Sequence, residues 1–381
     1  MRRYWALIAA ASLACERRPP PSAEPAATSV RAEPSVTMAS AAPVASVRVP
    51  APSASASSAV RVKPPPERAP PLPTSLLEAL PRPSGAEHAG LPGPVDASRD
   101  KQWLERLASA PITEITRNPG GATITIRVRF GDGNRAVWKP EQKHSASNFR
   151  SEIAAYHLDR IVGFSRTAAV VGRSLGYPHV LEHLEASNAD PEFIERFRAE
   201  VPARDGRIAG AMIAWHAGKL VSAEPPKGWT EGLRSKEPVR EELARRMPEW
   251  SDLIVFDFLI DNTDRWSGGN VLSLGGGGLI FLDNAAGFAS WRASRGETNQ
   301  SRLEPICRFR RATVEALRAL GPAAAPEARL GARLERSLAG DPLAPVLGKA
   351  QLRAVDTRVE RLLEHVERCT TELGEELVLS L

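Results

Sequence analysis

The sequence is poor in cysteine, with only Cys15, Cys307 and Cys369 in 381 residues. No group of cysteines and histidines has the spacing of a zinc site, and the seven histidines are scattered, so a zinc-binding module is excluded. The chain also lacks a dense lysine and arginine face with interleaved aromatic residues, which argues against nucleic-acid binding. A GxGxxG loop is missing as well, so any nucleotide site must be built differently.

Long apolar runs are scarce, and the one at the start of the chain is too short to cross a membrane. Two arginines precede the apolar stretch from Tyr4 to Leu13, which suits the core of a signal peptide. The segment Ser12 to Cys15 resembles a bacterial lipobox. We therefore expect residues 1–15 to be a signal peptide with a lipidated Cys15, giving an exported, membrane-anchored lipoprotein. A cleaved signal with an incidental cysteine, or an intracellular protein whose start is misread, is the alternative.

Residues 16–97 are expected to form a disordered, partly polyproline tether. Residues 1–97 contain 18 of the 33 prolines and carry a net charge of +3 out of +5 for the whole chain. A segment with so little apolar area cannot offset the entropy lost on folding. The remaining residues are close to neutral in charge, which again gives no electrostatic signature for nucleic acid.

Cys307 and Cys369 would be the two thiols of an exported enzyme. An oxidising compartment favours one disulfide between them, which would tie the ends of the C-terminal helical region. Two buried free thiols are the alternative.

The folded part is predicted to be α+β, with a β-rich half before a mostly helical half. We divide it into an N-lobe over 98–215 and a C-lobe over 216–381. The expected elements are a helix over 100–107, strands over 122–130 and 136–140 joined by a turn over 131–134, a helix over 147–163, a strand over 167–171, a buried strand within 207–221, a helix from 241 interrupted at Pro248 and resumed over 251–261, a hairpin over 271–282 and helices over 303–381.

Two residues of the first half suit a phosphate-binding site. Lys139 ends the second expected strand, and Glu152 follows 13 residues later on a helix that Ser147 can cap and Gly163 can end. Phosphoryl transfer needs a cation at the phosphates and a group that fixes that cation. Each residue alone is more often a solvated surface charge.

Three polar residues surround the expected hairpin of the second half. Asp264 lies in the loop after an apolar helix, and Asn270 and Asp283 stand before and after the hairpin. Asp264 could orient or deprotonate an acceptor hydroxyl, and the other two could hold a divalent metal, which prefers oxygen ligands. Capping and turn chemistry explain such residues equally well one by one. The ordered set of five favours a kinase-type site.

Four segments also resemble the secretory-pathway kinases, the family that includes the Golgi casein kinase and the four-jointed kinase. The resemblance spans roughly residues 119–310. It rests on VWKP, SEIAAYHLDRIVGF, DNTDR and LDNAAGF, which lie at 137–140, 151–164, 261–265 and 282–288.

This resemblance implies an atypical, two-lobed protein-kinase fold that uses ATP with Mn²⁺ or Mg²⁺. It makes Lys139 the nucleotide lysine, Glu152 its partner and Asp264 the catalytic aspartate. Asp283 would be the principal metal ligand, with Asn270 as a second. We also expect Gly120, Gly121 and Met212 at the nucleotide.

The expected function is transfer of the γ-phosphoryl group of ATP to a hydroxyl of a protein or a glycan, with protein favoured. A non-catalytic nucleotide- or ligand-binding protein on the same scaffold is the alternative. The sequence indicates no oligomeric state.

Overall fold

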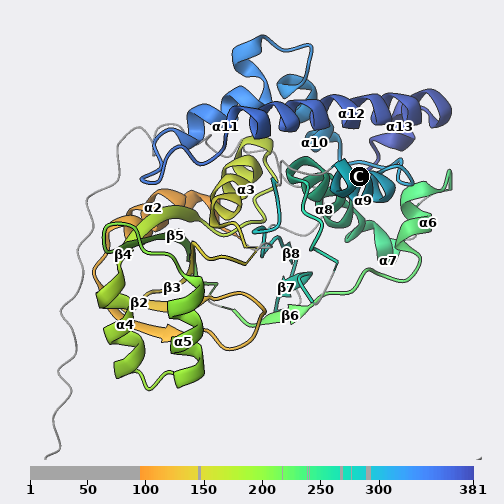
Figure 1. Cartoon of the computed structure of the whole chain (residues 1–381). Coiled ribbons are helices and arrows are strands. Elements are labelled where there is room, and N and C mark those ends of the chain that lie inside the picture. Colours follow the sequence, from red (N-terminus) through yellow and green to blue (C-terminus); the bar gives the residue numbers. More distant parts are fainter. Residues whose placement is uncertain are drawn as a thin grey trace, which may run out of the picture. The chain divides into compact units, whose positions relative to one another are not determined.

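The computed structural model describes residues 95–144, 147–216, 218–237, 239, 241–266, 269–275, 277–288 and 293–381. The predicted signal segment, Cys15 and nearly all of the predicted tether lie outside these residues. The described chain is α+β, as predicted. Figure 1 shows its β-rich part at one end and helices α6 to α9 at the other, while α11 and α12 lie along the top of the view. The proposed division at residue 215 stays a prediction.

A five-stranded antiparallel sheet forms the β-rich part. Its order is β1-β2-β3-β5-β4. The strands are β1 (Ile112–Arg117), β2 (Ile126–Phe130), β3 (Arg135–Pro140), β4 (Val170–Gly176) and β5 (Arg207–Ala214). The predicted hairpin is confirmed, since β2 and β3 pair with Ile126 opposite Trp138. The short helix α2 (Asp100–Ser109), also predicted, packs against β4 and β5.

Two strand boundaries differ from the prediction. The alternating run over 122–130 is a strand only from Ile126 onward, because the side chain of Gln142 takes both backbone groups of Ile124. The strand expected over 167–171 begins at Val170, since the carbonyl of Thr167 accepts a hydrogen bond from Arg160 instead of joining the sheet. Side chains compete with the strand ladder at both places.

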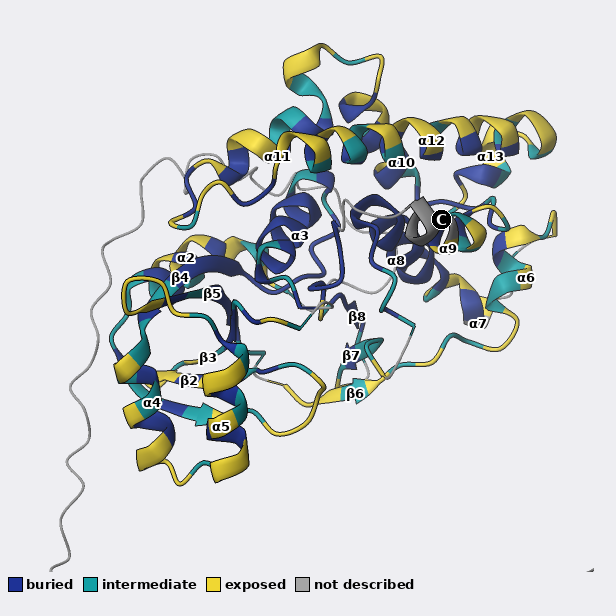
Figure 2. Ribbon diagram, viewed as in Figure 1, coloured by how far each residue is buried: buried dark blue, intermediate teal, exposed yellow. Residues whose placement is uncertain are grey.

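The helix α3 (Phe149–Val162) packs against β4 and β5 and is nearly all buried, as Figure 2 shows. Asn148 caps it, accepting a hydrogen bond from the amide of Arg150 at 3.1 Å, so the prediction of Ser147 as the cap is wrong. Gly163 ends the helix with φ 92°, as predicted, a conformation that glycine adopts at little cost.

Two helices were missed in the charged stretch after β4. They are α4 (Tyr177–Ala186) and α5 (Pro191–Glu200). Pro191 stands in the first turn of α5, and the Asp190 side chain accepts a hydrogen bond from the amide of Glu192 at 2.9 Å. This aspartate-proline start signals a helix that the charge of the segment obscures.

The helix α8 (Met247–Ile260) is buried at every position and precedes the loops of the site. Pro248 does not interrupt it but lies in its first turn, where a missing amide hydrogen costs nothing. The hairpin after it is shorter than predicted and consists of β7 (Leu272–Leu274) and β8 (Leu279–Ile280). Strand β6 (Leu220–Ser222) pairs with β7 and completes a second sheet.

The remaining helices surround α8 and α3. They are α6 (Trp229–Arg234), α7 (Glu241–Ala244), α9 (Ala293–Leu303), α10 (Arg311–Leu320), α11 (Leu330–Leu338), α12 (Lys349–Leu373) and α13 (Glu375–Val378). The predicted disulfide between Cys307 and Cys369 is confirmed. Among the described helices, none combines the length and apolarity that crossing a bilayer requires.

Candidate active site

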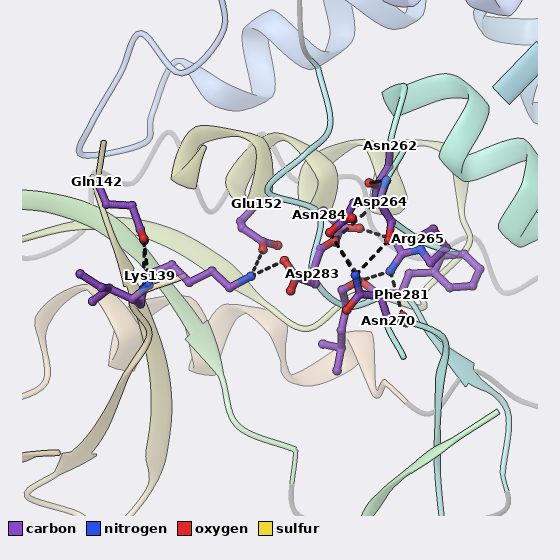
Figure 3. A network of polar contacts seen from close by, with 12 residues as sticks. Lys139, Gln142, Glu152, Asn262, Asp264, Arg265, Asn270, Phe281, Asp283 and Asn284 are labelled. Atoms are coloured by element: carbon purple, nitrogen blue, oxygen red, sulfur yellow. Dashed lines mark hydrogen bonds and ion pairs between the residues drawn. The ribbon is translucent and has the colours of Figure 1, made fainter. Parts of the chain in front are cut away.

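Lys139 joins the two halves of the site. Its Nζ donates to Glu152 Oε1 at 2.5 Å and to Asp283 Oδ1 at 2.7 Å, although Asp283 lies 144 residues away in sequence (Figure 3). Strand β3 brings the lysine to the site, α3 brings the glutamate, and the loop after β8 brings the aspartate. The structure thus brings together three of the five residues singled out from the sequence.

The charges of this trio stabilise one another. Burial alone would lower the pKa of Lys139, but the carboxylates of Glu152 and Asp283 outweigh burial and raise that pKa above its ordinary value. The ammonium group of Lys139 in turn lowers the pKa of Asp283. Lysine and aspartate are therefore both ionised at neutral pH, ready for a phosphate and a metal respectively.

A cavity of about 620 Å³ opens beside Lys139, within the range of volumes that hold small cofactors. Its apolar walls come from strands of both sheets and include Val137, Val170, Ile213, Leu272 and Phe281. Its polar lining includes Asn118, Gly120, Gly121, Thr123, Lys139, Glu152, His216, Asn270 and Asp283. An aromatic base would fit between the apolar walls, with a polyphosphate at the charged end.

The predicted glycine loop does cover the cavity. Gly120 and Gly121 have φ of 87° and 82°, where a side chain would be strained. The loop is held by Gln142, which accepts from the amide of Ile124 at 2.8 Å and donates to its carbonyl at 3.0 Å. Gln142 was missed from the sequence, because only the fold places it beside the loop.

Met212 does not line the cavity. It is fully buried and pairs with Trp138 in the sheet, while the adjacent Ile213 faces the cavity. Successive side chains of a strand point to opposite faces, so Ile213 lines the cavity and Met212 does not. The prediction placed Met212 on the strand that lines the cavity, but its side chain lies on the other face of that strand.

Asp264 and Asn270 lie together, as predicted. The side-chain amide of Asn270 donates to the Asp264 carbonyl at 3.0 Å and to Asp264 Oδ2 at 3.2 Å. Asn262 then links this loop to Asp283, since it accepts from the Asp264 amide at 3.1 Å and donates to the Asp283 carbonyl at 3.3 Å. The spacing of the two aspartates is thereby set by hydrogen bonds.

A buried arginine organises the same loops and was missed from the sequence. Arg265 is fully buried and pairs with Asp257 of α8, with Nε–Oδ1 at 3.1 Å. Its guanidinium also donates to the Leu282 carbonyl, to Asn284 Oδ1 at 2.6 Å and to the Asn270 carbonyl at 3.4 Å (Figure 3). Burial raises the pKa of Asp257 to about 6, against the opposing effect of Arg265. The signal that the sequence offered for this role was an arginine directly after Asp264.

The oxygen donors at this site fit a divalent metal. The Asp283 side chain is 46% exposed, whereas those of Lys139 and Glu152 are 9% and 3% exposed. Asn270 lines the same cavity and would present a neutral oxygen. Carboxylate and amide oxygens of this kind suit Mn²⁺ or Mg²⁺.

A second cluster with metal-ligand chemistry lies elsewhere. Cys307, His365 and Cys369 are close together, but the two sulfurs are bonded to each other and cannot serve as thiolates. His365 donates from Nε2 to the Ile306 carbonyl at 2.7 Å. This cluster is therefore a structural link between α12 and the segment before α10.

Several known proteins are similar in sequence to most of this chain. Mouse pseudokinase FAM20A is 28% identical over 335 residues, covering 75% of this chain and 60% of its own length. Human extracellular serine/threonine protein kinase FAM20C is 25% identical over 326 residues, covering 71% and 54%. Human glycosaminoglycan xylosylkinase is 29% identical over 323 residues, covering 72% and 76%. The chain thus spans under two thirds of the FAM20A and FAM20C sequences.

Solved structures give the fold. The Golgi casein kinase matches with a TM-score of 0.61 at 21% identity, covering 74% of this chain and 78% of that one. The same kinase with Mn/ADP bound matches with a TM-score of 0.60 at 20% identity. The predicted atypical kinase fold is confirmed. Since the family described as "Golgi casein kinase, C-terminal, Fam20" also matches residues 94–199 and 216–378, this chain belongs to that family.

Proposed function

We propose that this protein is a kinase that transfers the γ-phosphoryl group of ATP to a hydroxyl group. The observation that carries the proposal is the double ion pair of Lys139 with Glu152 and Asp283 at the mouth of a nucleotide-sized cavity. A lysine fixed by a helix glutamate beside a metal-binding aspartate is the arrangement that phosphoryl transfer requires.

ATP would lie with its base between the apolar walls of the cavity and its phosphates at Lys139. The backbone of Gly120 and Gly121, free of side chains, allows the loop to approach the phosphates closely. Glu152 holds the ammonium group of Lys139 in place, so this group does not have to be reoriented during the reaction.

Asp283 and Asn270 would hold Mn²⁺ or Mg²⁺. The bound metal would neutralise charge on the phosphate oxygens and orient the γ-phosphoryl group. A structure of the related Golgi casein kinase contains Mn/ADP, which supports this choice of ligand.

Asp264 is the proposed base. The acceptor hydroxyl oxygen forms a bond to the γ-phosphorus while the bond from that phosphorus to the β–γ bridging oxygen breaks. The hydroxyl proton passes to an oxygen of Asp264, and the electron pair leaves with ADP. Asn270, which donates to Asp264 Oδ2, keeps one carboxylate oxygen oriented.

The acceptor is proposed to be a protein serine or threonine, with a glycan as the second class. Support for both comes from the relatives, which include a serine/threonine protein kinase and a glycosaminoglycan xylosylkinase. The family also includes FAM20A, which is named a pseudokinase. Because Lys139 is paired with both Glu152 and Asp283, a catalytic role is favoured for this chain.

We further propose export and a lipid anchor at Cys15. The disulfide between Cys307 and Cys369 supports an oxidising compartment. In a bacterial host fed labelled palmitate, the full-length protein should become labelled and a Cys15→Ser variant should not. Equal labelling of both proteins would refute the anchor.

Radiolabel transfer from ATP tests the activity. Purified protein with Mn²⁺ is incubated with a panel of proteins and glycans, next to Asp264→Ala and, as a carboxylate control, Glu364→Ala on the exposed side of α12. We expect transfer by the wild type and the control, and a loss of roughly 10²- to 10⁴-fold in Asp264→Ala. Equal activity of Asp264→Ala would refute its role.

Thermal unfolding with ATP and Mn²⁺ separates a kinase from a non-catalytic binding protein. Asp264→Ala should retain the ligand-induced shift in melting temperature, whereas Asp283→Ala should lose the metal-dependent part of it. A shift without transfer to any acceptor would instead support a binding protein. No shift in the wild type would refute the nucleotide site.

A further inference from the structure

Helix α3 carries Glu152, and its position decides whether Lys139 is held. In protein kinases generally, the equivalent helix is a moving part whose displacement breaks the lysine–glutamate pair. Here all residues of α3 except Arg150 and Ile161 are buried, and it packs against β4, β5, α10 and α11. A helix covered on so many sides has little freedom to swing away.

The covering on one side comes from the C-terminal brace, which we define as residues 330–358, from α11 to the middle of α12. Figures 1 and 2 show α11 and α12 running along α3 and α8, with the exposed side of α12 turned outward. Within the brace, Ser337 Oγ lies 2.6 Å from Nδ1 of His157 on α3, and both residues are buried. This hydrogen bond joins the brace directly to the helix that bears Glu152.

The brace contacts three further elements of the site. The Asp341 carboxylate accepts from the amide of Gly172 on edge strand β4 at 2.9 Å. Gln351 donates to the carbonyl of Phe288, five residues after Asp283, at 2.8 Å, and Arg358 donates to the Leu259 carbonyl near the end of α8 at 2.7 Å. The brace therefore contacts the sheet, α3, α8 and the segment after Asp283.

Gly172 shows how close the brace lies to the sheet. A Cβ atom at this position would stand 2.3 Å from Asp341 Oδ1 and 2.8 Å from the Leu343 side chain. Neither the buried carboxylate nor the packed leucine could move away readily. The brace can therefore lie this close to β4 only because Gly172 has no side chain.

The other side of α3 is tied to the Asp283 loop. Ser151, the residue before Glu152, donates from Oγ to the Gly287 carbonyl at 2.7 Å. At the start of the helix, the amide of Asn148 donates to the Ala285 carbonyl at 3.1 Å. Glu152 and Asp283 are consequently fixed on a common frame.

We infer that Ser337 and Asp341 of the C-terminal brace are positioning residues that hold Glu152 against Lys139 before any ligand binds. The inference rests on the proposed nucleotide site. It implies that contacts made by the chain's own C-terminal segment help to seat the lysine–glutamate pair.

A double-mutant cycle on nucleotide binding tests the inference. The dissociation constant of ADP with Mn²⁺ is measured by calorimetry for wild type, Ser337→Ala, Glu152→Gln and the double variant. Loss of one buried hydrogen bond should weaken binding about three- to tenfold in the Ser337→Ala protein. In the Glu152→Gln background the same change should have no further effect, because Ser337 acts through Glu152.

Controls distinguish positioning from general destabilisation. Thr357→Ala, on the exposed side of α12, should bind like the wild type, and Ser337→Thr should restore binding because it keeps the hydroxyl group. Amide hydrogen exchange without ligand should quicken in α3 of Ser337→Ala. Should Ser337→Ala fail to fold, Asp341→Asn is tested in the same cycle, with the same expectation.

Equal weakening by Ser337→Ala in both backgrounds, or none in either, would overturn the inference while leaving the nucleotide site intact. Failure of the wild type itself to bind ADP and Mn²⁺ would instead overturn the proposed function. The two failures are therefore told apart by the wild-type measurement alone.

Discussion

The two halves of the candidate site are built in different ways. In the first half, regular elements carry the functional residues, with Lys139 at the end of β3 and Glu152 in α3. In the second half, Asp264, Asn270 and Asp283 lie in loops between short elements. Backbone hydrogen bonds of a strand and a helix fix the local geometry of the first pair, whereas side chains must fix the loops.

This difference explains why polar side chains are buried around the loops of the second half. Arg265 ties α8, the Asp264 loop, the start of β7 and the Asp283 loop into one network around a fully buried guanidinium. In the first half, Gln142 holds the glycine loop, and the ion pair of Lys139 with Glu152 is itself buried. The second half differs because a buried arginine fixes the backbone of its loops, whereas strand β3 and helix α3 are shaped by their own backbone hydrogen bonds.

Arg265→Met should give the largest effect, because it leaves Asp257 buried without its partner and frees the loops. We expect a loss of about 3 to 5 kcal/mol in the free energy of unfolding, measured by urea denaturation. Arg353→Met, on the exposed side of α12, is the matched control and should change this free energy little. If Arg265→Met lost less free energy of unfolding than Arg353→Met, the proposed role of Arg265 in fixing the loops would be contradicted.

Gln142→Leu is the corresponding change in the first half. It removes both hydrogen bonds to Ile124, so we expect a loss of about 1 to 3 kcal/mol in the free energy of unfolding. Nucleotide affinity should fall as well, because the loop is no longer held. Gln102→Leu, at an exposed position, serves as the control. If Gln142→Leu lowered the free energy of unfolding as much as Arg265→Met does, the two halves would not differ as described.

The third expected effect is a pH dependence that comes from His157. Burial, aided by Arg160, lowers its pKa to about 3 in the folded protein, below the ordinary value of 6.5. The unfolded chain therefore binds a proton first as pH falls. Stability from this group is complete above pH 6.5 and is lost toward pH 3, at about 1.4 kcal/mol per pH unit.

The measurement compares wild type with His157→Gln by urea denaturation between pH 7 and pH 4. The variant should lose less stability on acidification, and the difference isolates His157 from His216 and His365, whose pKa values are also lowered by burial. Parallel pH profiles for the two proteins would show that His157 does not titrate as expected.

The sequence could predict whatever depends on local pattern. The β2–β3 hairpin and the end of α3 at Gly163 were predicted in this way. The disulfide was predicted from the number of cysteines and the expected compartment. The roles of the five site residues stay predictions, although the structure joins three of them by ion pairs. Errors arose where a side chain intervened, as with Asn148 at the start of α3, or where two faces of a strand had to be distinguished, as with Met212 and Ile213.

What the amino-acid order determined by itself was the set of elements that carry the candidate site, because periodicity, capping and turn residues act over a few positions. Only the tertiary structure decided that Lys139 meets Asp283 across 144 residues, that Arg265 is buried among the loops and that residues 330–358 lie against α3. These contacts depend on packing between segments far apart in the chain, and no local pattern records such packing.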